Sequence, residues 1–173
     1  MKFNSEEELV LHFKNYFYKR INKDFIYLEE VKGLFGIPDG VLIEKNENNI
    51  CIISIEFKLN NWKRAIQQAF KYKSFSTHSF VIFDGYYSKS ILKNIEDFKQ
   101  FNIGLGFFYK GQGFNIVYFP KFERPFSEHY VNKMLNILGE NIESNNVITR
   151  DKVSIVNSED IFFQRYIQNN YTV

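Results

Sequence analysis

The sequence predicts an α/β domain with a central mixed sheet and helices on its faces. Segments whose apolar residues recur at helical spacing alternate with short apolar runs rich in β-branched and aromatic residues, and this alternation is typical of such sheets. Hydrophobic residues make up 45% of the 173 residues and aromatic residues 18%, so the chain can bury a substantial core. The expected order is α-β-β-β-α-β, followed by α-β-β-α and a tail.

The first half of the chain is expected to hold a helix, three strands and a second helix. Ser5 is a suitable N-cap, and Glu8 follows at the spacing of a capping box. Asn60 and Asn61 can cap the second helix, with Phe70 on its buried side. The expected elements are a helix over about 6–21, strands over 25–31, 39–44 and 50–58, a hairpin turn at 46–49, and a helix over about 61–73.

The second half is expected to continue the sheet and then to become polar. The segment Gly111-Gln112-Gly113 separates two apolar runs, which indicates a hairpin. From Gly139 onward few apolar residues remain, so we expect a domain over residues 1–138 and a polar C-terminal extension over 139–173. The expected elements are a strand over 79–83, a helix over 88–101, strands over 103–109 and 114–119, a helix over 126–138, and a short helix over 161–167.

Charged residues cluster at one end of the first predicted hairpin. Side chains alternate faces along a strand, so Ser54, Glu56 and Lys58 share one face of the third strand. Asp39 opens the preceding strand, and the predicted turn places it at the same end as Glu56. Two neighbouring carboxylates repel unless a cation lies between them, and a hard divalent ion such as Mg²⁺ takes oxygen ligands. Lys58 could then orient or help deprotonate an attacking water, or stabilise charge on a phosphate.

The segments Pro38-Asp39 and Glu56-Phe57-Lys58, each on its own strand between two helices, resemble the PD-(D/E)XK superfamily of nucleases. The resemblance covers about residues 6–84. It implies a restriction-endonuclease-like αβββαβ core and hydrolysis of DNA phosphodiesters that depends on Mg²⁺ or Mn²⁺. In that reading Asp39 and Glu56 bind the metal and Lys58 acts on the nucleophile.

Two further features extend the resemblance. Gln68 and Tyr72 form a Q-x-x-x-Y pattern, which is similar to the helix motif of RecB-type nucleases, whose residues border the active site and the DNA backbone. Residues four apart share one face of a helix, so the two side chains could point together. Members also often carry a glutamate early in the first helix, and Glu6 is the candidate here, with Glu7 as the alternative.

The second predicted helix also carries several cations. Lys63, Arg64 and Lys71, together with Tyr72, could bind the phosphates of DNA beside a metal site. The alternative interpretation is an ordinary solvated helix face. The net charge of +2 neither supports nor excludes an anionic partner, because only a local basic patch indicates one.

Other features of the sequence concern the cellular compartment of the protein and the possibility of a zinc site. A lone Cys51 suits a reducing compartment, and no run approaches the length of a membrane-spanning helix. The N-terminus lacks the apolar stretch of a signal peptide, so we expect a cytoplasmic protein without membrane contact. His12, His78 and His129 are scattered, which argues against a zinc site. The alternative to an enzyme is a catalytically inactive nucleic-acid-binding or protein-interaction domain of the same fold.

The C-terminal extension contains one apolar cluster. On a helix over 161–167, Phe162, Phe163, Tyr166 and Ile167 would form an apolar stripe. A helix this short needs a surface that buries the stripe, either on its own domain or on a second copy. We expect a homodimer, because cutting both strands of duplex DNA needs two sites and a two-fold dimer supplies them.

Overall fold

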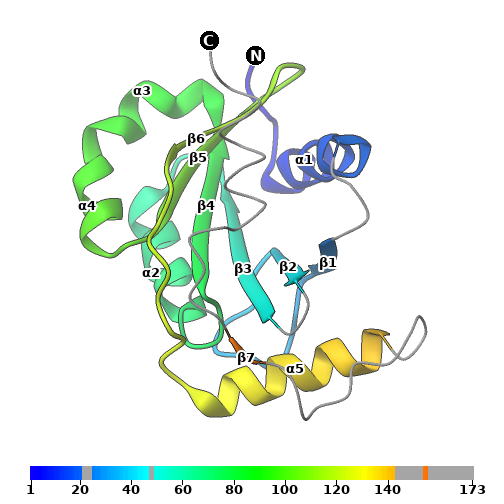
Figure 1. The fold of residues 1–173 in the computed structure, drawn as a ribbon. Helices are drawn as coiled ribbons and strands as arrows, with labels where there is room; N and C mark the ends of the chain where they lie inside the picture. The colour runs from blue at the N-terminus through cyan, green and yellow to red at the C-terminus, as the bar shows by residue number, and fades with distance from the viewer. Residues whose placement is uncertain (21–24, 47–48, 143–153, 156–173) are drawn as a thin grey trace.

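The computed structural model describes residues 1–20, 25–46, 49–142 and 154–155, and shows a mixed β-sheet with helices on both faces (Figure 1). The predicted α/β class is therefore confirmed. The elements in chain order are α1 (Glu6–Arg20), β1 (Phe25–Glu29), β2 (Gly40–Asn46), β3 (Asn49–Lys58), α2 (Trp62–Tyr72), β4 (His78–Asp84), η1 (Gly85–Tyr87), α3 (Ser88–Ile91), η2 (Leu92–Asn94), α4 (Ile95–Gln100), β5 (Gly104–Tyr109), β6 (Gly113–Tyr118), α5 (Glu128–Ile142) and β7 (Ser154–Ile155), where η1 and η2 are 3₁₀ turns.

The sheet has the strand order β1-β2-β3-β4-β5-β6, with β7 beside β3. Strands β1, β2 and β3 pair antiparallel, β3, β4 and β5 pair parallel, and β6 returns antiparallel to β5. Parallel neighbours need a crossover connection, and α2 provides it between β3 and β4. The result is a mixed sheet in which β3, the strand that carries Glu56 and Lys58, has a partner on each side.

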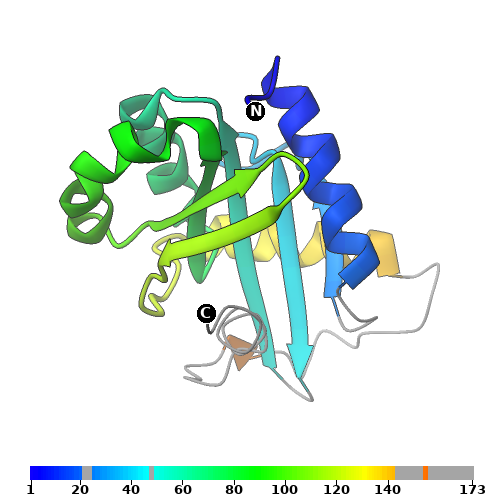
Figure 2. The same ribbon diagram turned by 90° about the horizontal axis from the view of Figure 1, so that it is seen from above.

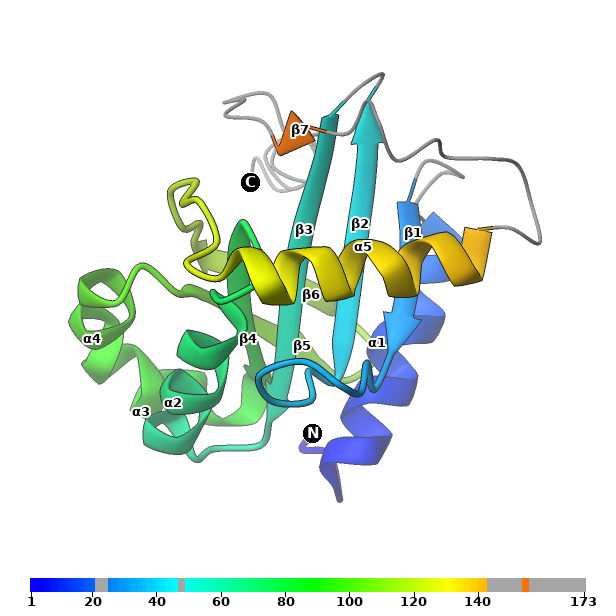
Figure 3. The same ribbon diagram turned by 90° about the horizontal axis from the view of Figure 1, so that it is seen from below.

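Helices cover the two faces of the sheet separately. Figure 2 shows α1 on one face of the sheet, and Figure 3, viewed from the opposite side, shows α5 crossing in front of β1, β2 and β3. The core under α1 is aromatic and aliphatic, and the core under α2 and α5 includes Tyr72 and Met134. Residues buried with α1 are Phe3, Leu9, Phe13, Phe17, Leu42, Ile53, Ile55, Phe57, Phe80, Ile82, Phe108 and Phe114.

The starts of both long N-terminal helices follow the predicted caps. Ser5 Oγ accepts a hydrogen bond of 3.2 Å from the Glu8 N–H, and Asn61 Oδ1 accepts one of 3.3 Å from the Arg64 N–H. The predicted burial of Phe70 is wrong, because its side chain is 45% exposed. It lies about 100° around the helix from the buried Ala69, beyond the edge of the buried face.

Three other differences from the sequence-based expectation concern element boundaries. The helix expected over 88–101 is interrupted at Leu92–Asn94, where the Asn94 side chain donates to the Ser90 carbonyl and so competes with the helical backbone. Strand β1 ends at Glu29 rather than at residue 31, and Glu30 has a positive φ of 44°. Helix α5 runs from Glu128 to Ile142 and so continues past residue 138, where the domain was expected to end.

The expected helix over 161–167 lies outside the described residues, so the homodimer stays a prediction. Among the helices in the described part of the chain, none is both long enough and apolar enough to cross a membrane.

Candidate functional site

The β2–β3 hairpin brings Asp39 and Glu56 together at its open end. Gly40 pairs with Ile55 in the antiparallel register, so Asp39, one residue earlier, lies opposite Glu56. The backbone N–H of Phe57 donates a hydrogen bond of 2.7 Å to Oδ2 of Asp39. The two carboxylates therefore meet at the end of the hairpin where the strand pattern predicts them.

Glu56 is a buried carboxylate whose charge is compensated by two neighbours. The residue is only 1% exposed, and its Oε2 accepts a hydrogen bond of 2.6 Å from the Tyr72 hydroxyl. Its Oε1 lies 2.7 Å from Lys58 Nζ, in an ion pair whose direction is not that of a hydrogen bond. A carboxylate buried this deeply is costly without such compensation.

Lys58 connects this site to the first helix. Besides its ion pair with Glu56, its Nζ donates to Glu6 Oε2 at 3.1 Å and to the Phe57 carbonyl at 3.0 Å. Glu6 is the first residue of α1, so the start of that helix lies against the end of β3. Glu7, the alternative acid, is exposed, so the geometry supports Glu6 as the acid next to the site.

The surroundings of Lys58 favour its charged form. Burial lowers the pKa of Lys58, but the close contacts and negative charges of Glu56 and Glu6 outweigh this effect, so that the pKa is raised. The side chain is therefore an ammonium group at neutral pH. In this arrangement it can donate hydrogen bonds and stabilise negative charge, whereas it is poorly suited to accept a proton.

Asp39 has the opposite electrostatic character. Burial of its side chain, followed by the nearby charge of Glu56, raises its pKa from 3.8 to about 6, although the Phe57 N–H and Lys58 act in the other direction. Only one of its oxygens, Oδ2, receives a hydrogen bond from the described residues. Asp39 is thus the member of the cluster with spare ligand capacity, and a nearby cation would stabilise its ionised form.

Helix α2 holds Glu56 in place from the far side of the site. Tyr72 is 1% exposed, and its hydroxyl lies within hydrogen-bond distance of both Glu56 Oε2, at 2.6 Å, and the Ile37 carbonyl, at 3.0 Å. Burial and then the charge of Glu56 raise the pKa of Tyr72, so the phenol stays protonated and donates. Gln68 lies one turn earlier on the same face, with a buried Oε1 that has no hydrogen-bond partner in the described residues.

The cations of α2 face solvent. Lys63, Arg64 and Lys71 are exposed, and none is in an ion pair with a described residue. The helix contains no aspartate or glutamate, and Lys63 Nζ lies 5.4 Å from the centre of the Trp62 ring. Tyr72, which the sequence grouped with these cations, is buried against Glu56 instead and is not part of the exposed basic face.

One buried acid at this edge of the sheet was missed by sequence reasoning. Asp84 ends β4, where the preceding Phe83 pairs with Lys58, and it is 0% exposed. Its carboxylate accepts hydrogen bonds of 2.9 Å from the N–H groups of Phe3 and Tyr86. It therefore holds the N-terminal segment that leads into α1, and an acid at the end of an apolar strand was the signal that could have revealed it.

A second cluster of reactive residue types has no nucleophilic character. Cys51 Sγ lies 3.6 Å from His78 Nδ1 and 3.3 Å from Thr77 Oγ1. Burial raises the pKa of the Cys51 thiol to about 12 and lowers the pKa of His78 to about 4, so both groups are neutral at pH 7. A nucleophilic cysteine needs the thiolate, which this environment disfavours.

The site around Asp39 and Glu56 is therefore the strongest functional candidate, and its interpretation rests on geometry. Across residues 1–20, 25–46, 49–142 and 154–155, no three or more His, Cys, Asp or Glu side chains are grouped so as to hold a metal ion. No protein-family model matches the chain, and no curated protein matches it.

Proposed function

We propose that the chain is a divalent-metal-dependent DNA nuclease with a restriction-endonuclease-like core of the PD-(D/E)XK type. The observation that carries this proposal is the convergence of Asp39, Glu56 and Lys58 at one end of the β2–β3 hairpin. The order α1-β1-β2-β3-α2-β4 agrees with the αβββαβ order of such a core. Burial of charged groups in this number is costly, which favours a functional reason for keeping them.

The donor atoms at the site suit a hard divalent cation. Asp39 and Glu56 would hold Mg²⁺ or Mn²⁺ through carboxylate oxygens, and the raised pKa of Asp39 reflects burial and repulsion that a cation would relieve. When bound, the ion would stabilise charge on a phosphate and lower the pKa of a bound water.

The remaining side chains would position the reacting groups. Lys58, held by Glu56, Glu6 and a backbone carbonyl, would present its ammonium group to negative charge that develops on the attacked phosphate. Tyr72 fixes one oxygen of Glu56, and Gln68 lies beside Tyr72 with an unused buried oxygen. These residues form a preorganised polar cluster, which costs little reorganisation when the substrate binds.

The exposed basic face of α2 would bind the DNA backbone. Lys63, Arg64 and Lys71 lie on the helix whose inner face carries Gln68 and Tyr72, so phosphates bound there would lie next to the acidic cluster. Because these cations have no carboxylate partners within the described residues, no intramolecular ion pair has to be broken before a phosphate binds.

A catalytically inactive nucleic-acid-binding or protein-interaction domain of the same fold is the second candidate. One observation favours it: the charge of Glu56 is already compensated by Lys58, and its second oxygen is bonded by Tyr72. An acidic residue satisfied in this way does not require a metal ion. Binding of Mn²⁺ and cleavage of DNA are therefore the measurements that separate the two candidates.

Cleavage of labelled single-stranded, duplex and branched DNA in Mg²⁺ or Mn²⁺ tests the proposal. We expect cleavage by the wild type that is lost in Asp39→Asn and Glu56→Gln but retained in Glu128→Gln, whose exposed acid lies on α5. Lys58→Ala should lower the cleavage rate by about 10²-fold or more, as for loss of one transition-state stabiliser.

Isothermal titration calorimetry with Mn²⁺ tests the metal site separately from cleavage. We expect binding by the wild type and by Lys58→Ala, and none by Asp39→Ala or Glu56→Ala. Unchanged Mn²⁺ binding in both acid variants would remove the metal site from the proposal. DNA binding without cleavage of any of the three DNA forms would favour the inactive domain.

A further inference from the structure

The loop that connects β1 to β2, residues 30–39 and here called the β1–β2 loop, is fixed against the candidate site. Gly36 has a φ of +97°, and a Cβ atom there would lie 2.8 Å from the Tyr72 ring, so the backbone packs directly on that ring. The Tyr72 hydroxyl contacts the Ile37 carbonyl and Glu56. The loop therefore shares its anchor with the acidic cluster.

Helix α5 holds the other side of the same loop. The Phe35 ring stacks on the Tyr130 ring with a centroid distance of 5.9 Å and an interplanar angle of 16°. Lys133 Nζ donates to the Gly33 carbonyl at 3.4 Å. Figure 3 shows the loop on the same side of the sheet as α2 and α5, in agreement with these contacts. A loop held at both sides presents its outer side chains in a defined position.

Two of these outer side chains are large and apolar. Phe35 is 44% exposed and Ile37 is 52% exposed. Ile37 is anchored through its backbone carbonyl, so its side chain is not needed to hold the loop. Ile37 also precedes Asp39 by only two residues, which limits the separation of their Cα atoms to about 7 Å. Exposed apolar groups this close to the candidate site point to a binding partner with apolar surface.

The charges around the loop narrow the chemistry of that partner. Three lysines lie near Phe35. Lys32 precedes it by three residues, Lys71 Nζ lies 5.8 Å from its ring centre, and Lys133 donates to the carbonyl of Gly33 in the same loop. None of the three lysines is in an ion pair within the described chain. Cations next to exposed apolar side chains suit a polyanion that carries flat apolar groups, which is the chemistry of a nucleic acid with unstacked bases.

We propose that Phe35 and Ile37 contact unstacked nucleobases, so that the preferred substrate is DNA with unpaired nucleotides beside the scissile phosphate, as in a splayed junction. This inference rests on the proposed nuclease function for the position of the phosphate. In an intact duplex the bases are stacked and a protruding apolar side chain must separate them, which costs free energy. At a junction the bases are already separated, and a preorganised loop loses little entropy on contacting them.

Fluorescence anisotropy in EDTA measures this preference without cleavage. The probes are a labelled splayed-arm DNA and a fully paired duplex of the same length. We expect the wild type to bind the splayed-arm DNA about tenfold more tightly. Phe35→Ala and Ile37→Ser should each weaken that binding about fivefold or more, and should change duplex binding by less than about twofold. Leu11→Ala, an exposed apolar residue on α1 at the other face of the sheet, is the matched control and should change neither.

Equal binding of the two DNAs by the wild type, or equal weakening of both by the substitutions, would overturn the inference. No effect of either substitution would also overturn it and leave these side chains for a protein partner. Thermal melting of each variant checks that it is folded. Cleavage is measured separately. Cleavage of duplex DNA at a rate that does not depend on Ile37 would support the nuclease proposal and refute the loop preference. A preference for splayed-arm DNA that depends on Ile37, without cleavage, would support the loop preference and refute the nuclease proposal.

Discussion

Replacing Asp39 by Asn should stabilise the metal-free protein at pH 8, because the wild-type carboxylate is ionised there in a place that disfavours its charge. A pKa raised from 3.8 to about 6 corresponds to about 3 kcal/mol of lost stability once the group is fully ionised. The side chain is partly exposed, and solvent screening reduces the expected gain to about 2 kcal/mol. Asparagine can still accept the hydrogen bond from the Phe57 N–H, so the substitution removes the charge and keeps that contact.

The sign of the pH dependence follows from proton binding in the two states. Between pH 4 and pH 6 the folded state holds a proton on Asp39 that the unfolded state has released, so this residue lowers stability as the pH rises through that window. Other carboxylates change stability in the same range, and for this reason the difference between the wild type and Asp39→Asn is the quantity to measure. The difference should be near zero below pH 4 and should reach its full value above pH 6.

Thermal unfolding in EDTA at pH 4, 6 and 8 provides the assay. For a chain of this size about 2 kcal/mol corresponds to a rise in Tm of about 4–8 °C at pH 8. Added Mn²⁺ should raise the Tm of the wild type but not that of Asp39→Asn. At a free Mn²⁺ concentration about a hundred times Kd, the free energy of unfolding of the wild type should increase by about 2.7 kcal/mol. Glu128→Gln, which removes an exposed acid on α5, should match the wild type both in Tm at each pH and in its response to Mn²⁺. An Asp39→Asn variant less stable than the wild type at pH 8 would refute the electrostatic reasoning.

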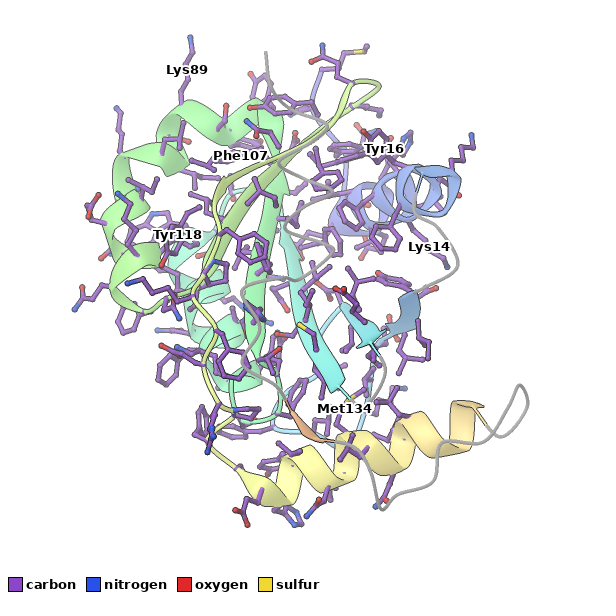
Figure 4. The ribbon with its side chains drawn as sticks, viewed as in Figure 1. Lys14, Tyr16, Lys89, Phe107, Tyr118 and Met134 are labelled. Carbon is purple, nitrogen blue, oxygen red and sulfur yellow. The ribbon has the colours of Figure 1, made fainter. Side chains whose placement is uncertain are left out.

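Two further predictions concern α2. Tyr72→Phe should lower the free energy of unfolding by about 1.5–3 kcal/mol in urea titrations, because it removes the hydroxyl that donates a hydrogen bond to the buried Glu56 carboxylate. A loss below about 0.5 kcal/mol would mean that this hydrogen bond contributes little to stability. Lys63→Ala and Lys71→Ala should each reduce the slope of log K for DNA against log salt concentration by about 1. Lys89→Ala should not, because Lys89 lies on α3 and not on the basic face of α2 (Figure 4). Unchanged slopes in both α2 variants would place the DNA elsewhere.

Local pattern was sufficient to predict the hairpin end of the site. Alternation along a strand decides that Glu56 and Lys58 share a face, and a short turn decides that Asp39 returns to the same end. Both are properties of neighbouring residues, so no knowledge of the rest of the chain is needed. The helix caps at Ser5 and Asn61 were predicted for the same reason, since each depends on contacts within one turn.

The contribution of α2 could not be predicted in this way. Phe70 and Tyr72 are both aromatic, and the apolar pattern alone did not show which of them faces the sheet. Tyr72 can be buried because its hydroxyl contacts Glu56 and the Ile37 carbonyl, two hydrogen-bond partners that are distant in sequence. Burial of a tyrosine depends on such partners. The orientation of the helix was thus decided by tertiary contacts that the sequence pattern does not contain.

These contacts also explain how one cluster could alternate between a metal-free and a metal-bound arrangement. In the structure Lys58 supplies the positive charge that the buried Glu56 needs, so the charge of Glu56 is compensated in the metal-free protein. Asp39 has no such ion pair with a described residue, and its charge is disfavoured in the metal-free protein. A divalent ion would then relieve Asp39 and would reduce the need of Glu56 for Lys58, which would leave the ammonium group available to a phosphate. Loss of the Lys58 side chain should therefore destabilise the metal-free protein more than the protein saturated with Mn²⁺.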